Sequence, residues 1–486
     1  MSGIVAGERL DLSALSVEAL RGRRVAVLGF ARSGLAAARF LADAGALVTV
    51  YDVRPREELL DRIDALEGRQ VALRLGPRVD PGALLGDREL IVTSPSVSSR
   101  YPTTEPRLRA ALAAAEAEGR APVVSEVDLF LRLCPATTIG VTGTKGKTTT
   151  ASLIAAVLES DGAPTWLGGN IGRPLIDRVG EMGPGDRVVV ELSELQLPTL
   201  SRGTDVAVYT NVTADHLDRH GSVGAYRAAK ARLAELTRER RGLLVLNGED
   251  PFVAALARPG DRVVRYGRSA PTDGGVGVLD GWVTAAGSAI LPLDEIPLPG
   301  AHNLSNVLAA VAAGIHFAIP GGAIRRAVAG FPGVEHRLET VATVDGIRYV
   351  NDSQGTQPDA VIAALRAFEP PIVLIAGGRE KGVDLTGLAA EVAGRAHGAV
   401  LIGEAALAFE RLFAAAGLER IERAEGMEDA VRAADRMARA TRRRGGPPAT
   451  VLLSPAAASF DMFEDYEARG RAFKEAVARV VGRDTR

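Results

Sequence analysis

The sequence predicts an α/β protein of three domains, each with a largely parallel sheet wound with helices. Short β-branched runs alternate with Ala- and Leu-rich helical stretches along the chain, and Gly or Asp stands at each switch. Many of the β-branched runs are continuously apolar, which is typical of strands covered by helices on both faces. A length of 486 residues suits three domains at roughly 100–200 residues per domain.

The first series of elements predicts a Rossmann-like domain over residues 1–125. It reads as strand, helix and strand in RVAVLGF (24–30), SGLAAARFLADAG (33–45) and ALVTVYD (46–52). The second series predicts a P-loop domain over 126–333, with strands in TTIGVT (137–142) and RVVVELSEL (187–195). Residues 296–324 are uncharged but contain three prolines, so we expect a loop and a buried helix there and no membrane span.

The third series predicts a dinucleotide-fold-like domain over 334–486. It opens with a hairpin that turns on Asp345-Gly346, because an Asp-Gly pair suits the tight turn between antiparallel strands. Strands in PIVLIAGG (371–378), AVLIGE (399–404) and TVLLSPAAASF (450–460) follow, each with a helical pattern after it.

Composition excludes several classes of function. The 58 Lys+Arg nearly balance the 60 Asp+Glu, and aromatic residues are only 4%, so a dedicated nucleic-acid binder is disfavoured. The single cysteine, Cys134, excludes an internal disulfide and a cysteine-based zinc site. Without a recognisable targeting segment, we expect a cytoplasmic protein.

The strongest motif is GTKGKTTT (143–150), which lies between an apolar strand and a helix. Glycines let backbone N–H groups surround a polyphosphate, and the helix N-terminus adds partial positive charge. Lys147 is placed to reach the β- and γ-phosphates, and Thr148 to hold Mg²⁺ through its hydroxyl. The motif predicts a site for a nucleoside triphosphate, although its spacing departs from the usual pattern.

Glu191 is a candidate partner of Mg²⁺ near this motif, and two further residues follow it along the chain. Glu191 ends the strand one βα unit later, at the edge where α/β sheets place their ligands. His216 follows the next strand, although a single loop histidine is usually structural. Lys230 lies on the following helix, whose periodicity by itself favours an ordinary solvated face.

A second glycine loop follows the first strand. Gly29 and Gly34 resemble the ends of a dinucleotide fingerprint, with Asp52 closing the second strand 18 residues after Gly34. Ala31 replaces the middle glycine, which weakens the match, but a nucleotide remains favoured over a purely structural turn. Candidate polar contacts are Arg32, Ser33, Asp52 and Arg54.

Further candidates lie in the last two domains. Asn303 and Asn306 are three residues apart at the start of a helix, where they suit either a helix cap or contacts to an adenine edge. Lys381 and Ser459 each follow a predicted strand and are candidates for a central cleft. Surface lysines are common, so Lys381 taken alone is weak evidence for a binding site.

The ordered motifs resemble the Mur ligases over essentially the whole chain. The series includes GTKGKTTT, GGNIG (168–172), ELSELQL (191–197), NVTADHLDRHGS (211–222), YRAAK (226–230), HNLSN (302–306), HRLE (336–339), NDSQGT (351–356) and LSPAAASFDMFEDYEARG (453–470). The resemblance implies an ATP-dependent ligase that adds D-glutamate to UDP-N-acetylmuramoyl-L-alanine through an acyl phosphate, in peptidoglycan precursor synthesis. It also implies Mg²⁺, with two ions, a carbamylated Lys230, and a monomer without a nucleic-acid partner.

The resemblance assigns roles to individual residues. Those implied for ATP are Gly143, Thr144, Lys145, Gly146, Lys147, Thr148, Thr149, Asn303, Asn306, His336, Arg337 and Asp352. Those implied for the UDP substrate are Gly29, Phe30, Ala31, Arg32, Ser33, Asp52, Arg54, Asn170, Ser193, Gln196 and His216. Those implied for D-glutamate are Thr356, Lys381, Ser459, Phe460 and Tyr466. Metal ligation falls to Thr148, Glu191, His216 and Lys230, and catalysis to Lys147, His216, Lys230 and Arg337.

Two positions depart from the family pattern. Gln354 stands where the family usually has a lysine, and Glu194 replaces a usual serine. Any role of that lysine in charge neutralisation does not carry over to Gln354. The sequence lacks the base-reading motifs of a GTPase switch. A nicotinamide dehydrogenase would leave the GKT segment unexplained. A non-catalytic nucleotide-binding scaffold would not need the candidate metal ligands. The diaminopimelate- or lysine-adding relatives usually carry a DNPR-like motif, which this sequence lacks. Folylpolyglutamate synthases share the P-loop but not the full HRLE, NDSQGT and LSPAAAS series.

Overall fold

The computed structural model describes residues 10–119, 121–213, 217–271, 274–298, 300–380, 384–441 and 448–483. Its contacts divide the chain into two compact units, residues 1–297 with 301–331 and residues 298–300 with 332–486. The first unit holds two sheets and the second holds one. The predicted fold class, three α/β domains with mostly parallel sheets, is confirmed. The domain boundaries remain predictions.

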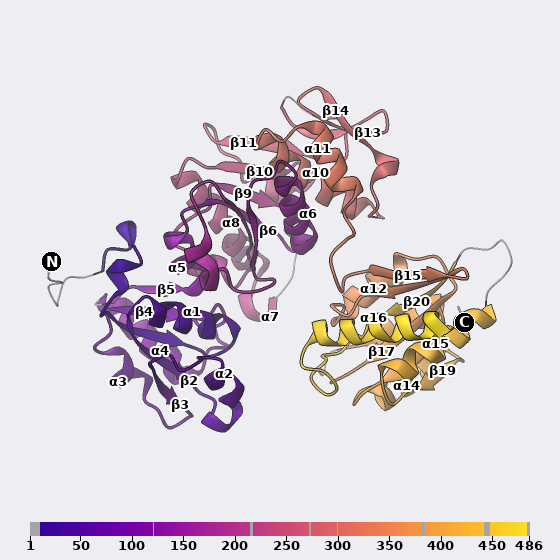
Figure 1. Cartoon of the computed structure of the whole chain (residues 1–486), viewed down its shortest axis with the longest axis horizontal. Coiled ribbons are helices and arrows are strands. Elements are labelled where there is room, and N and C mark those ends of the chain that lie inside the picture. Colours follow the sequence, from indigo (N-terminus) through magenta and orange to yellow (C-terminus); the bar gives the residue numbers. More distant parts are fainter. Residues whose placement is uncertain are drawn as a thin grey trace. The chain divides into compact units, whose positions relative to one another are not determined.

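The N-terminal sheet has five parallel strands in the order β3-β2-β1-β4-β5. Its strands are β1 (Arg24–Leu28), β2 (Leu47–Asp52), β3 (Val71–Leu75), β4 (Leu90–Thr93) and β5 (Val123–Ser125). Its α-helices are α1 (Arg32–Asp43), α2 (Leu60–Asp64), α3 (Pro81–Leu85) and α4 (Pro106–Glu118), and α5 (Glu126–Leu133) follows β5 (Figure 1). Strand order reverses at β1, so the carboxyl ends of β1 and β4 border the crevice where such sheets bind ligands.

The central sheet has nine strands in the order β14-β13-β12-β11-β10-β9-β6-β8-β7. The parallel part consists of β6 (Thr137–Thr142), β7 (Thr165–Gly169), β8 (Arg187–Glu191), β9 (Val206–Tyr209), β10 (Leu243–Asn247) and β11 (Arg262–Tyr266). Strand β12 (Val276–Leu279) pairs parallel with β11, and β13 (Trp282–Ala285) and β14 (Ser288–Pro292) extend the edge antiparallel. The helices are α6 (Lys147–Glu159), α7 (Leu217–His220), α8 (Val223–Glu239), α9 (Pro251–Ala254), α10 (Ala301–His316) and α11 (Gly321–Ala329).

One hydrophobic core joins the two sheets of the first unit. It contains Val25 and Val50 of the N-terminal sheet together with Val188 and Val190 of the central sheet, all essentially unexposed. Helix α10 packs against α6, and its residues from Val307 to Ala313 are fully buried. The uncharged stretch therefore forms a buried helix, as predicted. No helix among the described residues combines the length and apolar character that crossing a membrane requires.

The sheet of the second unit has six strands in the order β15-β16-β20-β17-β18-β19. These are β15 (Glu339–Val344), β16 (Ile347–Asn351), β17 (Ile372–Gly377), β18 (Ala396–Ile402), β19 (Ile421–Arg423) and β20 (Ala449–Leu453). The helices are α12 (Pro358–Arg366), α13 (Thr386–Arg395), α14 (Ala406–Ala415), α15 (Met427–Thr441) and α16 (Tyr466–Arg483), and α16 packs on β15, β16 and α15 (Figure 1).

The predicted hairpin between β15 and β16 is present. Val344 pairs with Ile347, and the two residues between them, Asp345 and Gly346, have φ angles of 52° and 71°. Two consecutive positive φ angles define the turn that matches the twist of antiparallel strands, and Asp-Gly adopts it readily. The hairpin places the HRLE segment and the NDSQGT segment at the same end of the sheet.

Candidate active site

The loop between β6 and α6 is shaped by close approach to other backbone and side-chain atoms. Gly146 has φ 83°, and a Cβ atom there would lie 2.5 Å from the side-chain oxygen of Asn306. Only glycine fits both conditions. Lys145 N donates to Asn211 Oδ1 (3.0 Å), while Thr210 Oγ1 and Asn211 Nδ2 donate to the Lys145 carbonyl (2.7 and 3.0 Å). The loop is thus held in place by the segment after β9.

Lys147 curls back over this loop. Its Nζ donates to the carbonyl oxygens of Gly143 (3.1 Å) and Thr144 (3.0 Å). Thr148 and Thr149 follow in the first turn of α6 and are buried. Lys147 opens the helix, whose free N–H groups carry partial positive charge. The loop therefore presents the backbone donors and the ammonium that a polyphosphate requires.

Asn303 and Asn306 lie buried beside the loop. Thr150 Oγ1 donates to Asn306 Oδ1 (3.1 Å), and Asn306 Nδ2 donates to Asn303 Oδ1 (3.2 Å). Because α10 begins at Ala301, Asn303 lies within the first turn and is not the helix cap that the sequence also allowed. The hydrogen bond between Thr150 and Asn306 fixes α10 against α6, and the side chain of Asn306 packs against Gly146 of the loop. A contact from either residue to adenine remains a prediction.

Glu191 lies at the carboxyl end of β8, next to the strand that leads into the loop. It is the register partner of Val141 on β6 and is 1% exposed. Asn170 Nδ2 donates to its Oε1 (2.8 Å), whereas its buried Oε2 has no hydrogen-bond partner among the described residues. A carboxylate oxygen buried without a donor is unfavourable, and a hard cation such as Mg²⁺ satisfies it. The chemistry of Glu191 therefore fits a metal ligand.

Lys230 is fully buried, which overturns the solvated face that helix periodicity favoured. Its exposed fraction is 0%, and its Nζ donates to the Gly143 carbonyl (2.9 Å) and lies 3.4 Å from Thr142 Oγ1. The Nζ is also 5.5 Å from the centroid of the Tyr226 ring. The periodicity failed because the loop end of β6 covers this part of α8. The side chain thus reaches the loop itself. Its role at a metal site stays a prediction.

Two predicted residues, His216 and Lys381, lie outside the described residues. The flanking segments are described up to Thr213 and from Leu217, and up to Glu380 and from Asp384. Their predicted roles toward the metal, the UDP substrate and glutamate stay predictions.

A cavity of about 360 Å³ opens at the carboxyl ends of the N-terminal strands. Gly29, Phe30 and Ala31 from the first glycine loop line it, as do Asp52 and Arg54. A Cβ atom at Gly34 would lie 1.8 Å from the Gly29 carbonyl oxygen, so the loop packs directly on α1. Arg32 points toward the central sheet, where Nη2 donates to the Asn170 carbonyl (3.3 Å), and Ser33 follows it at the start of α1.

Asp52 organises the rim of the cavity. Its Oδ2 accepts from Phe30 N (2.7 Å) and Arg54 Nη2 (2.8 Å), and its Oδ1 accepts from Arg54 N and Nε (2.9 and 3.0 Å). Burial raises the pKa of Asp52, but these hydrogen bonds outweigh burial and hold the pKa below its ordinary value. Asp52 is therefore an ionised acceptor at neutral pH that fixes both the glycine loop and Arg54.

The turn after β8 carries the other predicted UDP-substrate residues. Gln196 Oε1 accepts from Ser193 N (2.9 Å) and Ser193 Oγ (3.1 Å), and both side chains are buried. Together with Asn170, these residues surround the carboxyl end of β8. The structure thus brings Asn170 to Glu191, with Ser193 and Gln196 in the turn after β8. It places Gly29, Phe30 and Ala31 with Asp52 and Arg54 at the cavity, whereas Arg32 and Ser33 are not among the residues that line it.

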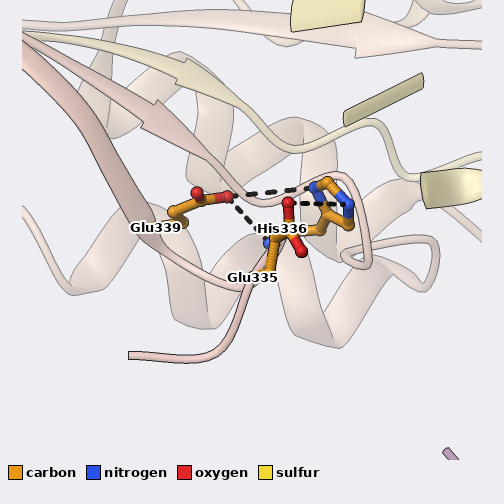
Figure 2. A group of neighbouring side chains, drawn as sticks. All are labelled: Glu335, His336 and Glu339. Carbon is orange, nitrogen blue, oxygen red and sulfur yellow. Dashed lines mark hydrogen bonds and ion pairs between the residues drawn. The ribbon is translucent and has the colours of Figure 1, made fainter. Parts of the chain in front are cut away.

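In the second unit, His336 is fixed by a network of acidic and amide groups. Figure 2 shows Glu335 and Glu339 close to it; Glu339 Oε2 accepts from His336 N (2.9 Å). Asn351 Nδ2 donates to His336 Nδ1 (2.9 Å), so the ring proton belongs on Nε2. Chiefly because it is buried, the pKa of His336 is lowered, and the ring is neutral at pH 7.

Glu335, His336 and Glu339 have the side chains and the spacing of a cation site, because one potential ligand atom from each lies within 4.8 Å of the other two. Lys474 already supplies the positive charge. Its Nζ donates to Glu335 Oε1 (3.0 Å) and Glu339 Oε1 (2.7 Å). The cluster is therefore a structural support that orients the HRLE segment.

Asp352 lies directly beneath this segment. Ser454 Oγ donates to Asp352 Oδ2 (2.6 Å), and Leu338 N lies 3.3 Å from Oδ1. Burial raises the pKa of Asp352 to about 6, opposed by the Ser454 hydrogen bond and the nearby charge of Arg337. His336, Arg337 and Asp352, which were predicted together for ATP, therefore lie together at one end of the sheet.

The described residues predicted for glutamate also lie in this unit. Ser459 is 3% exposed, Phe460 is 63% exposed, and Tyr466 opens α16 with its ring 6.3 Å from that of His336. Thr356 N donates to the Gln354 carbonyl (2.8 Å) within the loop after β16. Tyr466 is tied to that loop because its carbonyl accepts from Ser353 Oγ (2.7 Å). Binding of glutamate by these residues remains a prediction.

Comparison with known proteins decides the family. Family models match residues 23–117 (Mur ligase MurD-like, N-terminal domain), 141–314 (Mur ligase middle domain) and 336–457 (Mur ligase, glutamate ligase domain). A UDP-N-acetylmuramoylalanine–D-glutamate ligase from Pelotomaculum thermopropionicum is 42% identical over 462 residues, covering 94% of this chain and 97% of that protein. The chain belongs to the Mur ligase family. The resemblance drawn from its motifs is confirmed.

Other relatives of this Mur ligase agree. A protein of the same name from Symbiobacterium thermophilum is 40% identical, covering 93% of this chain and 97% of its own length. A solved UDP-N-acetylmuramate–alanine ligase from Thermotoga maritima has a TM-score of 0.57 at 18% identity, covering 94% of this chain and 100% of that one. That structural likeness concerns the fold alone.

Arg219 was missed by the sequence interpretation although it lines the cavity. It comes from α7 of the central domain, and its Nη1 is 3.9 Å from Glu194 Oε1. Glu194, the residue that departs from the family's usual serine, is buried. An acidic residue at this position of the Mur ligase is thus matched by an arginine at the cavity wall. Glu194 lies in the ELSELQL segment and Arg219 in the NVTADHLDRHGS segment, so the sequence motifs could have indicated this pair.

Arg469 was also missed, and it joins two loops of this Mur ligase. It is 1% exposed; its Nε donates to Ser353 Oγ (3.0 Å), its Nη2 to the Ser353 carbonyl (2.9 Å) and its Nη1 to the Ala457 carbonyl (3.2 Å). Burial lowers the pKa of Arg469 to about 10, so it remains charged at neutral pH. It holds the NDSQGT loop against the SPAAAS loop.

We expect Arg469→Met to destabilise the full chain by about 2–3 kcal/mol, because three buried acceptors lose their donor. The measurement is the urea midpoint of the unfolding transition. Arg471→Met, two residues along the same helix, is the matched control. Arg471 is exposed, and its Nη1 forms only a long ion pair with Glu467 Oε2 (3.9 Å). Equal midpoints for the two variants would contradict the structural role of Arg469.

Proposed function

We propose that this Mur ligase joins D-glutamate to UDP-N-acetylmuramoyl-L-alanine, with ATP as the energy source, in peptidoglycan precursor synthesis. The observation that carries the proposal is the site at the ends of β6 and β8. There a polyphosphate-shaped loop, the buried Lys230 and the unpaired oxygen of Glu191 meet. The names of the relatives and the glutamate ligase domain model support the choice of amino acid.

Residues 1–125 bind the UDP substrate in this proposal. The glycine loop and the N-terminus of α1 suit a diphosphate, because no side chain caps that helix end, where the backbone N–H groups carry partial positive charge. Asp52 and Arg54 form the rim beyond it. Asn170, Ser193 and Gln196 receive the muramoyl-alanine end beside Glu191.

Residues 126–333 activate the carboxylate. A carboxylate is a poor electrophile in water. Its oxygen attacks the γ-phosphorus of ATP, the bond from that phosphorus to the bridging oxygen breaks and ADP leaves, and the product is an acyl phosphate whose phosphate is a good leaving group. Lys147 and the loop N–H groups stabilise charge on the transferring oxygens, and Arg337 is a further candidate for this role. Thr148, Glu191, His216 and Lys230 would hold Mg²⁺, which supplies further neutralisation of phosphate charge when bound.

Residues 334–486 receive the amino acid. Thr356, Lys381, Ser459, Phe460 and Tyr466 orient glutamate so that its neutral amine attacks the acyl carbon, and phosphate then leaves. His216 is a candidate for positioning or accepting the proton. His336 and Asp352 are candidates for contact with the nucleotide, as are Asn303 and Asn306.

Finer features belong to the same proposal. We infer two Mg²⁺ ions and a carbamate on Lys230, since a carbamate turns a fully buried ammonium into an oxygen donor suited to Mg²⁺. A carbamate N–H retains the hydrogen bond to the Gly143 carbonyl. We also infer a monomeric, cytoplasmic enzyme with small-molecule substrates.

The test is an assay of phosphate release from ATP with a panel of nucleotide sugars and amino acids. We expect release only when UDP-N-acetylmuramoyl-L-alanine and D-glutamate are both present. L-glutamate, L-lysine and diaminopimelate serve as competing amino acids, which matters because Gln354 replaces a lysine that the family usually has. Turnover with one of these but not with D-glutamate would refute the proposed specificity and leave the ligase class intact.

A further inference from the structure

Tyr51 carries a buried hydroxyl that the fold leaves unsatisfied. The residue is next to last in β2, and its side chain is 0% exposed. Its hydroxyl oxygen has no hydrogen-bond partner among the described residues. Buried polar atoms nearly always have a partner, so an exception calls for an explanation.

The ring of Tyr51 packs on the face of the sheet opposite Val48 and Val50. It belongs to a small apolar cluster with Leu28, Leu84 and Leu108. Phenylalanine would fill the same space without the cost of a desolvated hydroxyl. The packing therefore accounts for the ring and leaves the hydroxyl unexplained.

The cavity at the ends of the N-terminal strands supplies a destination for the hydroxyl. Tyr51 lines this cavity of about 360 Å³, together with the apolar side chains of Val97, Leu108 and Leu195. In a sheet of this kind the phosphates lie at the N-terminus of the first helix, and the nucleoside extends past the end of the second strand. Tyr51 is at that second position, where the apolar side chains suit a flat base and the polar residues Ser94, Ser96, Thr103, Thr104 and Glu105 also line the cavity.

The protonation state of Tyr51 suits a donor. Burial, and after it the charge of Glu105, raises the pKa of Tyr51, with Asp52 and Asp80 acting in the same direction and Arg107 opposing them. The phenol therefore keeps its proton at neutral pH and offers an O–H group. A pyrimidine base offers ring carbonyl oxygens as acceptors.

We propose that Tyr51 is a specificity-determining residue whose hydroxyl donates a hydrogen bond to a carbonyl oxygen of the pyrimidine base of the nucleotide substrate. The inference rests on the proposed function, which places a UDP moiety in this cavity. It adds a base contact from the apolar side of the sheet, which neither the glycine loop nor the Asp52–Arg54 pair provides.

The test compares wild-type protein with Tyr51→Phe by calorimetric titration of UDP and of pyrophosphate, which lacks the base. We expect the Kd of UDP to rise about 5- to 20-fold and the Kd of pyrophosphate to stay unchanged. In turnover, KM for the UDP substrate should rise while kcat stays within about twofold, because the contact is equal in the ground and transition states.

Stability separates this role from a merely structural one. Because the hydroxyl is unpaired in the free protein, Tyr51→Phe should unfold at the same temperature as wild type or higher. Tyr349→Phe is the matched control: Tyr349 is equally buried, but its hydroxyl donates to Asp435 Oδ1 (2.6 Å). That variant should have a lower Tm and an unchanged Kd for UDP.

Two results would overturn the inference. One is an unchanged Kd of UDP in Tyr51→Phe, and the other is a fall in Tm of the free variant like that of Tyr349→Phe. Failure of the proposed function gives a different result, because wild-type protein would then not bind UDP at all. The two failures are therefore distinguishable in a single set of titrations.

Discussion

Lys147→Ala is expected to lower the turnover number by about 10³-fold, roughly 4 kcal/mol of transition-state stabilisation. The ammonium of Lys147 donates to the carbonyls of Gly143 and Thr144 and lies at the start of α6. From that position it reaches the phosphates of a nucleotide seated on the loop. Alanine keeps the helix, since it has the highest helix propensity, and removes only the charge.

Binding of the UDP substrate should survive this substitution. The cavity that Gly29, Asp52 and Tyr51 line is formed by the N-terminal sheet, whereas Lys147 belongs to the loop after β6. We therefore expect the Kd of UDP to stay within about twofold, measured by titration, while phosphate release nearly ceases. Arg366→Ala removes an exposed cation that pairs with Glu391 and should change neither quantity.

Loss of UDP binding together with turnover in Lys147→Ala would contradict the separation of the two sites. It would mean that the N-terminal sheet and the P-loop do not bind their ligands independently. Retained turnover would contradict the assignment of Lys147 itself.

Patterns that depend on neighbours in sequence were predicted correctly. The Asp345-Gly346 turn, the glycine loop before α6 and the buried helix from Ala301 depend on local conformation and apolar composition. The parallel sheets follow from the alternation of strands and helices. In each case the residues that determine the structure lie within a few positions of one another, so a single sequence contains the information.

Properties that depend on distant parts of the chain were not predictable in the same way. Lys230 has the periodicity of a solvated helix face, yet a loop 87 residues away covers it. Arg469 has ordinary helical neighbours, and only the fold brings Ser353 to it. The unpaired oxygen of Glu191 depends on where Asn170 donates, which no local pattern reveals. The motif resemblance supplied the role of Lys230 that physical reasoning from the helix alone did not.

Glu191→Gln is expected to lower turnover by about 10²- to 10³-fold and to raise the Mg²⁺ concentration needed for half-maximal activity. The buried Oε2 of Glu191 has no donor among the described residues, and an amide in its place brings no negative charge to a cation. The measurement is phosphate release as a function of Mg²⁺ concentration. Asn170→Ala should give a smaller loss, about 10- to 100-fold, because Asn170 acts only by orienting Glu191 through Oε1.

Stability without metal should change in the opposite direction. A buried carboxylate oxygen without a donor is costly, so Glu191→Gln should have a Tm in chelator equal to or above that of wild type. Added Mg²⁺ should raise the Tm of wild type, since a ligand that binds only the folded state stabilises it, and should raise that of the variant less. A variant that loses activity and also unfolds earlier in chelator would show that Glu191 serves the fold. Equal gains in Tm on adding Mg²⁺ would remove it from the metal site.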